Sequence, residues 1–290
     1  MADVQFRIDS AAGSLPLVST PFEWGPYRLG AGTTGLGLAP ELTRIVPSPA
    51  GGGTIRGSRP GIRKGTLQIT MEGSSRGHTQ ELIDALALAL KIRNRPELVA
   101  VVPDQGTWRL PFVRVGGGEP AYDNGGDELL TWDIEVECPG TFWIRDEPVE
   151  FTVKQIAEGM VGLLPDLAKL QVAPSAAIGA IEAANPGTEE VPIHWRITGP
   201  GGPATVLIGG RGFTLSSVLT AGQFVTVTRT EQGWRVTDQA GASKYSALGA
   251  APKFPMAPPG AIEGVAALSN ATSAAASIAG WFNPAREVIH

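Results

Sequence analysis

The sequence predicts a mainly β protein, built from two sheet-rich domains with a helix in the first. Three observations lead to this fold class. Apolar residues make up 42% of the 290-residue chain and charged residues 18%, a balance typical of a globular protein. The chain carries 38 glycines and 24 prolines, which suit many short strands joined by turns. Apolar and polar residues also alternate in many short runs, as half-buried strands require.

The first domain is expected over residues 1–147. Thr79 is a candidate N-cap for a helix over 79–95, and Pro96 ends that helix. Together with the strands, the helix predicts a sheet or sandwich with one helix packed on it. Alternation predicts the strands of this domain over the ranges 4–8, 67–71, 98–102, 108–115 and 132–138.

A second domain is expected over residues 148–290, with the boundary near Pro148. Short alternating runs at regular spacing predict an antiparallel sandwich. A tight turn is expected at 231–233. The expected strands cover the ranges 193–197, 205–208, 224–229 and 234–238.

The run 29–65 is dense in glycine and proline, and we expect a long segment without regular structure. Segments of this kind are usually functional or form an interface. The run contains Gly30-Ala-Gly32-Thr-Thr-Gly35, which matches the spelling of a dinucleotide-binding loop. Pro40 interrupts any following helix and no acidic residue lies at the ribose-binding distance, so this match is taken as accidental.

No residues are expected to carry chemistry, and no cofactor or metal is expected. Cys138 is the single cysteine, which excludes an intrachain disulfide and favours a small core residue. The three histidines are not spaced as metal ligands. The acidic loop 123–128 could hold calcium, but an ordinary Asn-Gly turn is the favoured interpretation. The formal net charge of -5 gives no sign of nucleic-acid binding, and neither a signal peptide nor a membrane span is expected.

A succession of motifs in the second half resembles the C-terminal, galectin-like domain of siphophage distal tail proteins, particularly the minor tail proteins of actinobacterial phages. The first half resembles the family in the order of its parts: a glycine-rich stretch at 51–65, a strand at Leu67, the helix, and the segment 136–143. The motifs of the second half are Asn185-Pro-Gly187, Ile193-His-Trp195-Arg-Ile197, Ala221-Gly222-Gln-Phe-Val225, Pro258-Pro259-Gly260 and Trp281-Phe-Asn-Pro284.

The resemblance implies a structural virion protein without enzymatic activity, assembled in the host cytoplasm and located at the distal end of the phage tail. The N-terminal domains would form a homohexameric ring that joins the tail tube protein and the tape measure protein to the tail-tip and host-adsorption proteins. DNA would pass through the lumen without specific binding. The residues expected at the subunit interface are Leu29, Leu36, Leu38, Ile45, Ile55, Arg56 and Arg59.

An alternative from another class is a carbohydrate-binding module that contacts the host cell wall through the galectin-like half. A sugar site needs exposed aromatic side chains near polar groups, and the expected glycan contacts are Trp234 and Trp281. A hydrolase is the least favoured class, because no acid–base pair can be assigned.

Overall fold

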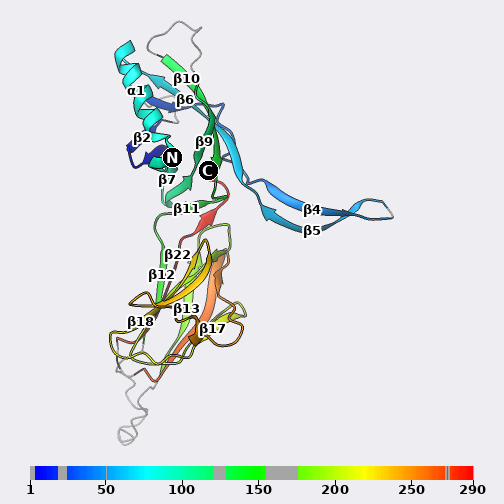
Figure 1. Ribbon diagram of the computed structural model, residues 1–290, viewed down its shortest axis with the longest axis vertical. Helices are drawn as coiled ribbons and strands as arrows, with labels where there is room; N and C mark the ends of the chain where they lie inside the picture. The colour runs from blue at the N-terminus through cyan, green and yellow to red at the C-terminus, as the bar shows by residue number, and fades with distance from the viewer. Residues whose placement is uncertain are drawn as a thin grey trace, which may run out of the picture. The chain divides into compact units, whose positions relative to one another are not determined.

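The computed structural model describes residues 4–18, 25–49, 51–119, 129–154, 176–271, 273 and 275–289, and for 176–178 the backbone alone. These residues form strands with one α-helix, which confirms the mainly β fold class (Figure 1). The chain divides into two compact units: unit 1 contains residues 1–147 and 285–290, and unit 2 contains residues 148–284. The last six residues therefore belong to the first unit, whereas the sequence placed all of 148–290 in the second.

Unit 1 contains two sheets and a separate hairpin. The six-stranded sheet has the order β2-β1-β7-β8-β11-β23, and the four-stranded sheet has the order β3-β6-β10-β9. The first sheet consists of β1 (Gln5–Ser10), β2 (Gly13–Leu17), β7 (Glu97–Val102), β8 (Gly106–Pro111), β11 (Trp143–Arg145) and β23 (Ala285–Arg286). The second consists of β3 (Tyr27–Leu29), β6 (Arg63–Glu72), β9 (Val113–Gly117) and β10 (Leu129–Cys138).

Alternation in the sequence places the core of unit 1 between these sheets. On β10, Trp132, Ile134 and Val136 are buried, while Asp133 and Glu135 between them are exposed. Cys138 continues the buried row, as expected of a small core residue. Burial raises the pKa of its thiol to about 11, which keeps the thiol protonated and unreactive at neutral pH.

The helix α1 (Arg76–Ala89) lies in unit 1 and begins three residues before the expected N-cap. Its N-cap is Ser75, whose side chain accepts a hydrogen bond from the backbone N–H of His78. The predicted cap, Thr79, was wrong because it lies one turn inside the helix, where its hydroxyl donates to the Ser75 carbonyl. A short 3-10 helix, η1 (Ile92–Asn94), follows in place of the expected last helical turn.

The run 29–65 is not without regular structure, and this expectation was wrong. It holds β4 (Glu41–Pro47) and β5 (Gly53–Pro60), which pair with each other and with no other strand of the described chain. The turn between them uses Gly51 and Gly52, whose positive φ angles of 92° and 74° suit glycine. The run also contains Gly30, Gly32 and Gly35, and a strand follows them where a dinucleotide-binding loop requires a helix.

Unit 2 contains a five-stranded sheet of order β12-β22-β15-β18-β19, a four-stranded sheet of order β13-β21-β16-β17 and the small pair β14-β20. Trp195 and Phe213 come from opposite sheets, and their rings meet edge to face at 6.3 Å in the core. The 3-10 helix η3 (Tyr245–Ala247) lies beside β19. The strands are β12 (Val149–Lys154), β13 (Ala176–Asn185), β14 (Val191–Pro192), β15 (His194–Thr198), β16 (Ala204–Ile208), β17 (Arg211–Leu215), β18 (Phe224–Thr230), β19 (Gly233–Asp238), β20 (Met256–Ala257), β21 (Gly260–Ser269) and β22 (Ser277–Phe282).

A buried arginine holds the centre of unit 1 together. Arg63, the first residue of β6, is only 1% exposed. Its guanidinium donates hydrogen bonds to the backbone carbonyls of Gly35 at 3.0 Å, Thr141 at 3.0 Å and Glu287 at 2.8 Å, and also to that of Gly37. Burial lowers the pKa of Arg63, but an arginine remains charged in proteins. One side chain thus ties the segment before β4, the loop before β11 and the segment after β23 to the start of β6.

A second charged cluster lies on the six-stranded sheet. Arg109 on β8 forms ion pairs with Asp9 at 3.2 Å, with Glu97 at 3.1 Å and with Asp146. Burial alone would raise the pKa of Asp9, but hydrogen bonds from Ser14 and Arg7, with the charges of Arg7 and Arg109, outweigh burial and lower it. The cluster therefore links β1, β7 and β8 across the surface of the sheet.

We expect Arg63→Met to destabilise unit 1 by at least about 3 kcal/mol, because several backbone carbonyls lose the buried guanidinium that donates to them. Arg59→Met is the matched control, since Arg59 is exposed on the hairpin and should change stability little. Urea unfolding followed by circular dichroism measures both. Equal transition midpoints for the two variants would contradict the structural role of Arg63.

We expect Asp9→Asn to destabilise the chain by about 1 kcal/mol at pH 7, because the asparagine cannot form the ion pairs. The folded pKa of Asp9 is depressed, so its stabilisation is fully present above the unfolded pKa of about 3.9 and is lost as the pH falls through the lower folded value. The difference between wild type and variant should therefore narrow below about pH 4. Urea unfolding at pH 7 and pH 3 tests this, and a difference independent of pH would rule it out.

Candidate functional site

The β4–β5 hairpin is the candidate site of unit 1, because it stands clear of both sheets (Figure 1). Every residue of β5 is exposed, and every residue of β4 except the half-buried Val46. Cross-strand bonds stiffen its polar side: the Thr43 and Ser58 hydroxyls lie 3.3 Å apart, and Ser58 donates to the Glu41 carboxylate at 2.7 Å. The hairpin is thus an ordered arm whose two faces are both available for contact.

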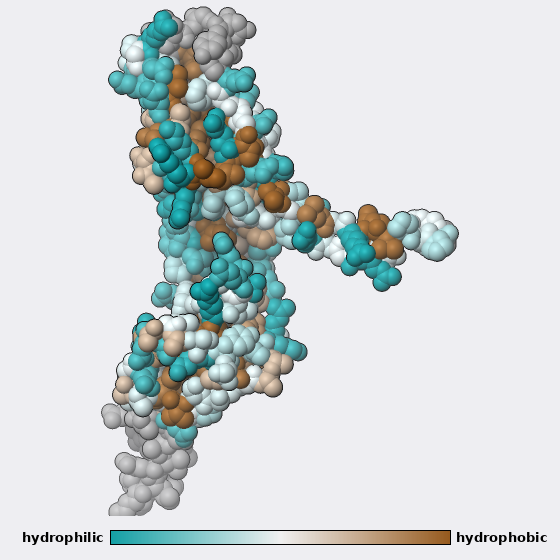
Figure 2. Space-filling view, viewed as in Figure 1, coloured by the Kyte–Doolittle hydropathy of each residue, from teal (hydrophilic) through white to brown (hydrophobic). Residues whose placement is uncertain are grey.

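Apolar side chains on this arm are exposed where a solvated hairpin would carry polar ones. Ile45 and Ile55 are directly opposite each other in the register, and they are 62% and 66% exposed. Figure 2 shows hydrophobic side chains at intervals along the hairpin. Leu42, on the same arm, is also exposed. Exposed apolar side chains that lie next to each other are common at protein interaction sites.

Positive charge accompanies the apolar side chains. Arg44 lies on β4, and Arg56 and Arg59 lie on β5. Among the described residues, none of these three arginines takes part in an ion pair, and Glu41 is the single acidic residue of the two strands. The arm therefore presents an apolar pair flanked by guanidinium groups, a composition that favours an acidic and partly apolar partner surface.

The base of the hairpin is packed closely onto β6. Gly35 has a φ of 83°, and a Cβ placed on it would collide with the backbone of Lys64 and Gly65. Thr34 and Thr66 exchange backbone hydrogen bonds of 2.8 Å and 3.3 Å at the same place. With the Arg63 bonds, these contacts give the exposed arm a fixed origin.

The predicted interface residues fall into two groups. Leu29 on β3 and Leu36 are half-buried and pack against the core of unit 1, which places them away from the exposed surface. Leu38 is 77% exposed near the base of the hairpin. The structure brings together the others on the arm itself: Ile45, Ile55, Arg56 and Arg59.

Sequence reasoning missed Leu42 and Ile62, which are also exposed near the base of the arm. No alternation singles out Leu42, because β4 has no buried face to set such a pattern. Ile62 has no such signal either, because it lies in the two-residue link between β5 and β6.

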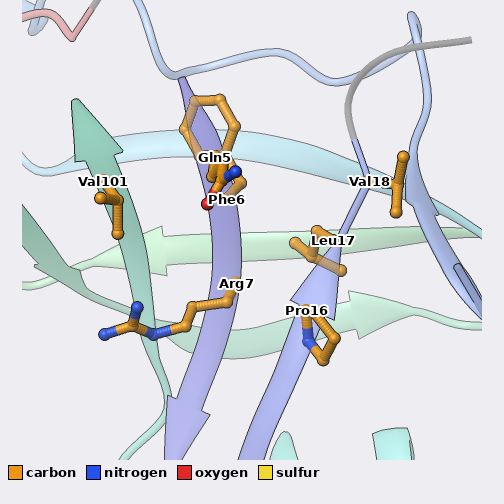
Figure 3. Close-up of a pocket in the computed structure, with 7 residues that line it drawn as sticks. All are labelled: Gln5, Phe6, Arg7, Pro16, Leu17, Val18 and Val101. Atoms are coloured by element: carbon orange, nitrogen blue, oxygen red, sulfur yellow. The ribbon is translucent and has the colours of Figure 1, made fainter. Parts of the chain in front are cut away.

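A pocket of about 240 Å³ lies on the six-stranded sheet of unit 1. Arg7 is the single charged group of its lining, and its guanidinium is already bonded to Asp9 at 3.0 Å. Figure 3 shows the lining side chains spread along neighbouring strands, with Arg7 directed away from Val18. The pocket therefore offers no converging set of groups for catalysis. Its lining residues are Gln5, Phe6, Arg7, Pro16, Leu17, Val18 and Val101.

The two tryptophans predicted to contact glycans occupy different environments in unit 2. Trp234 stacks on Phe254 with ring centroids 4.4 Å apart, so its own chain covers one face of the indole. Trp281 stacks on His194 with centroids 5.7 Å apart, and both side chains are half-buried. The structure therefore does not bring the two tryptophans together in one site.

Groups that could hold a metal are not found in the part of the chain that the structure describes, where no cluster of three or more histidine, cysteine or acidic side chains occurs. No described helix is long and apolar enough to cross a membrane. The acidic loop 123–128, for which a turn was favoured over a calcium site, lies outside the described residues.

Comparison with known proteins finds similarity of structure rather than of sequence. No protein-family profile matches the chain, and no curated protein matches it. The Dit protein (gp 19.1) of SPP1, described as a paradigm of the hub adsorption apparatus in phages that infect Gram-positive hosts, matches with a TM-score of 0.65 at 11% identity, over 97% of this chain and 98% of that chain. Two structures of the phage P2 baseplate in its activated conformation, with Ca and with Sr, match with TM-scores of 0.49 and 0.48 at 11% and 12% identity, over 99% of this chain and 100% of theirs. The SPP1 match confirms the predicted resemblance at the level of the fold.

The close packing at the hairpin base predicts that Gly35→Ala destabilises unit 1 by about 1–3 kcal/mol, because alanine is strained at positive φ and its Cβ meets backbone. Gly37→Ala is the control: a Cβ there meets nothing within 4 Å. Thermal unfolding of the two variants should give a lower Tm for Gly35→Ala alone. A similar loss in both would show that the base is not closely packed.

Proposed function

We propose that this chain is a non-enzymatic structural protein of a phage tail tip, which assembles through unit 1 into a ring at the distal end of the tail. The observation that carries the proposal is the exposed β4–β5 hairpin with its apolar pair Ile45 and Ile55. The fold shared with the SPP1 Dit protein over nearly the whole chain supports the same role.

Burial in an assembly stabilises the hairpin. A two-stranded hairpin alone is at best marginally stable in water. Burying one isoleucine side chain is worth about 1.5–3 kcal/mol, so covering Ile45 and Ile55 adds several kcal/mol to a contact. A second copy of the chain is the proposed partner. The arm of one copy packs on the body of the next, and repetition of this head-to-tail contact closes a ring.

An edge strand of unit 1 supplies further contact surface. The four-stranded sheet ends in β3 and β9. Val18 exchanges backbone hydrogen bonds with Tyr27 and Leu29 and so occupies the outer edge of β3. The outer edge of β9 pairs with no strand among the described residues, and such an edge adds a strand from a neighbouring chain readily. In the proposed ring this edge lies beside the arm contact, so that backbone hydrogen bonds and apolar burial act at the same interface.

The number of subunits and the partners follow from the resemblance. The ring contains six copies and joins the tail tube protein and the tape measure protein to the tip and host-adsorption proteins. DNA passes through the lumen without specific binding. The solvent-exposed face of β10 carries Asp133 and Glu135. Negative charge of this kind suits a lumen that must repel the phosphates of the DNA backbone.

The apolar pair gives the proposal a direct test. We expect Ile45→Asp with Ile55→Asp to leave the chain folded and monomeric, while the wild type has the mass of a ring in light scattering. Charge at both positions removes the apolar burial and introduces repulsion within the contact. The fold should survive, because both side chains are already exposed.

The control is Leu207→Asp with Val265→Asp. These residues are also an exposed cross-strand pair, at 50% and 49%, but they belong to unit 2 and should leave the ring intact. A wild-type chain that stays monomeric at every concentration would overturn the proposed assembly. An intact ring in the hairpin variant would show that the arm is not part of the subunit interface.

A further inference from the structure

The outer face of the five-stranded sheet in unit 2 brings an aromatic pair and a carboxylate into one row. In the strand register Trp281 is paired with Glu150 on β12 and with His194 on β15, so the three side chains share a face. Phe282 and Trp195, their neighbours along the chain, are fully buried and point into the core. The row therefore faces away from the core of the unit.

Trp281 and His194 form an aromatic platform in this row. Their rings stack on each other, with centroids 5.7 Å apart and an angle of 22° between the planes. His194 therefore covers one face of the indole, and the opposite face lies on the side of β12. Both are half-buried, so part of each ring remains accessible. An aromatic surface held in this way by a neighbouring ring loses little conformational entropy when it binds a ligand.

The state of His194 is fixed by its surroundings. Its Nδ1 atom accepts a hydrogen bond from the backbone N–H of Arg229 at 3.3 Å. Burial lowers the pKa of His194, so the ring is neutral at pH 7. The proton then resides on Nε2, which makes that atom a hydrogen-bond donor.

Charged groups with no ionic partner flank the platform. Glu150 is exposed beside Trp281. Arg196, two residues beyond His194 on the same face, is exposed with its Cζ atom 3.8 Å from the centroid of the Phe224 ring. Within the part of the chain that the structure describes, neither Glu150 nor Arg196 forms an ion pair. Both side chains therefore keep their hydrogen-bonding capacity for a ligand.

A small side chain lies between these groups on the same face. Ala279, paired with Arg196 on one side and Thr152 on the other, lies two residues before Trp281 and shares its face. Its methyl group is much shorter than the side chains around it. The side chains of Arg196, Thr152 and Trp281 therefore surround a short side chain on this face.

We infer that this face binds a neutral hexopyranose, with Trp281 and His194 as the stacking platform and Glu150 and Arg196 as the polar contacts. The apolar C–H face of a pyranose packs on an aromatic ring. Its hydroxyls donate to the carboxylate and accept from the guanidinium and from Nε2 of the imidazole. A neutral sugar fits best, because an anionic one would meet Glu150. The site lies within unit 2 and does not depend on ring assembly.

Saturation-transfer NMR and titration with methyl β-glucopyranoside, methyl β-galactopyranoside and methyl α-mannopyranoside test the inference on the full chain. We expect at least one of the three to bind, Trp281→Ala to abolish binding, and Glu150→Gln to weaken it about tenfold or more, the effect of losing one charged hydrogen bond. Glu263→Gln is the matched control, since Glu263 is exposed on the other sheet of the same unit and should leave binding unchanged.

Glu150→Gln alters an exposed side chain, so it keeps the test valid if Trp281→Ala does not fold. Absence of saturation transfer from all three sugars, or equal affinity in Glu150→Gln and wild type, overturns the inference. Light scattering on the same samples reports the ring separately. A failed sugar site therefore leaves the proposed function standing, and a failed ring leaves the sugar site standing.

Discussion

The structure of unit 1 depends on the burial of one guanidinium. Arg63 starts β6 and donates to carbonyls from segments more than two hundred residues apart in the chain, including that of Glu287. A buried cation is costly unless its donors are satisfied, so these segments must stay in place for the unit to remain folded. Because the hairpin begins and ends beside Arg63, this constraint also fixes the origin of the exposed arm. The stability of unit 1 and the position of the arm are thus linked through one residue.

The two units present different kinds of surface. Unit 1 exposes the aliphatic side chains of Leu42, Ile45 and Ile55 on a hairpin that has no partner strand within the described chain. Unit 2 keeps its large aromatic residues mostly inside, and holds a half-buried aromatic pair among polar groups on one sheet. The first surface suits a protein partner that excludes water, and the second suits a small polar ligand. Neither surface assembles a nucleophile with a base, which fits a protein whose role is contact.

Much of the fold could be predicted because most of its strands have one solvent-exposed face and one buried face. The alternation of Trp132, Ile134 and Val136 with acidic residues predicted β10 without ambiguity. The hairpin could not be predicted in the same way, because both of its faces are exposed and the pattern has no contrast. Arg63 was missed since a charged residue is expected at the surface. The return of residues 285–290 to unit 1 depends on the long-range pairing of β23 with β11, which no local pattern records. The pairing of Trp281 with His194 depends in the same way on strand register.

In the proposed ring the β4–β5 arm becomes buried between copies of this chain. Electron cryomicroscopy of the purified protein tests it most directly, because it shows both the assembly and the position of the arm. We expect a hollow ring in which the hairpin of each subunit lies against its neighbour, with Ile45 and Ile55 covered. Single copies, or a ring whose hairpins project freely into solvent, would contradict the proposed assembly.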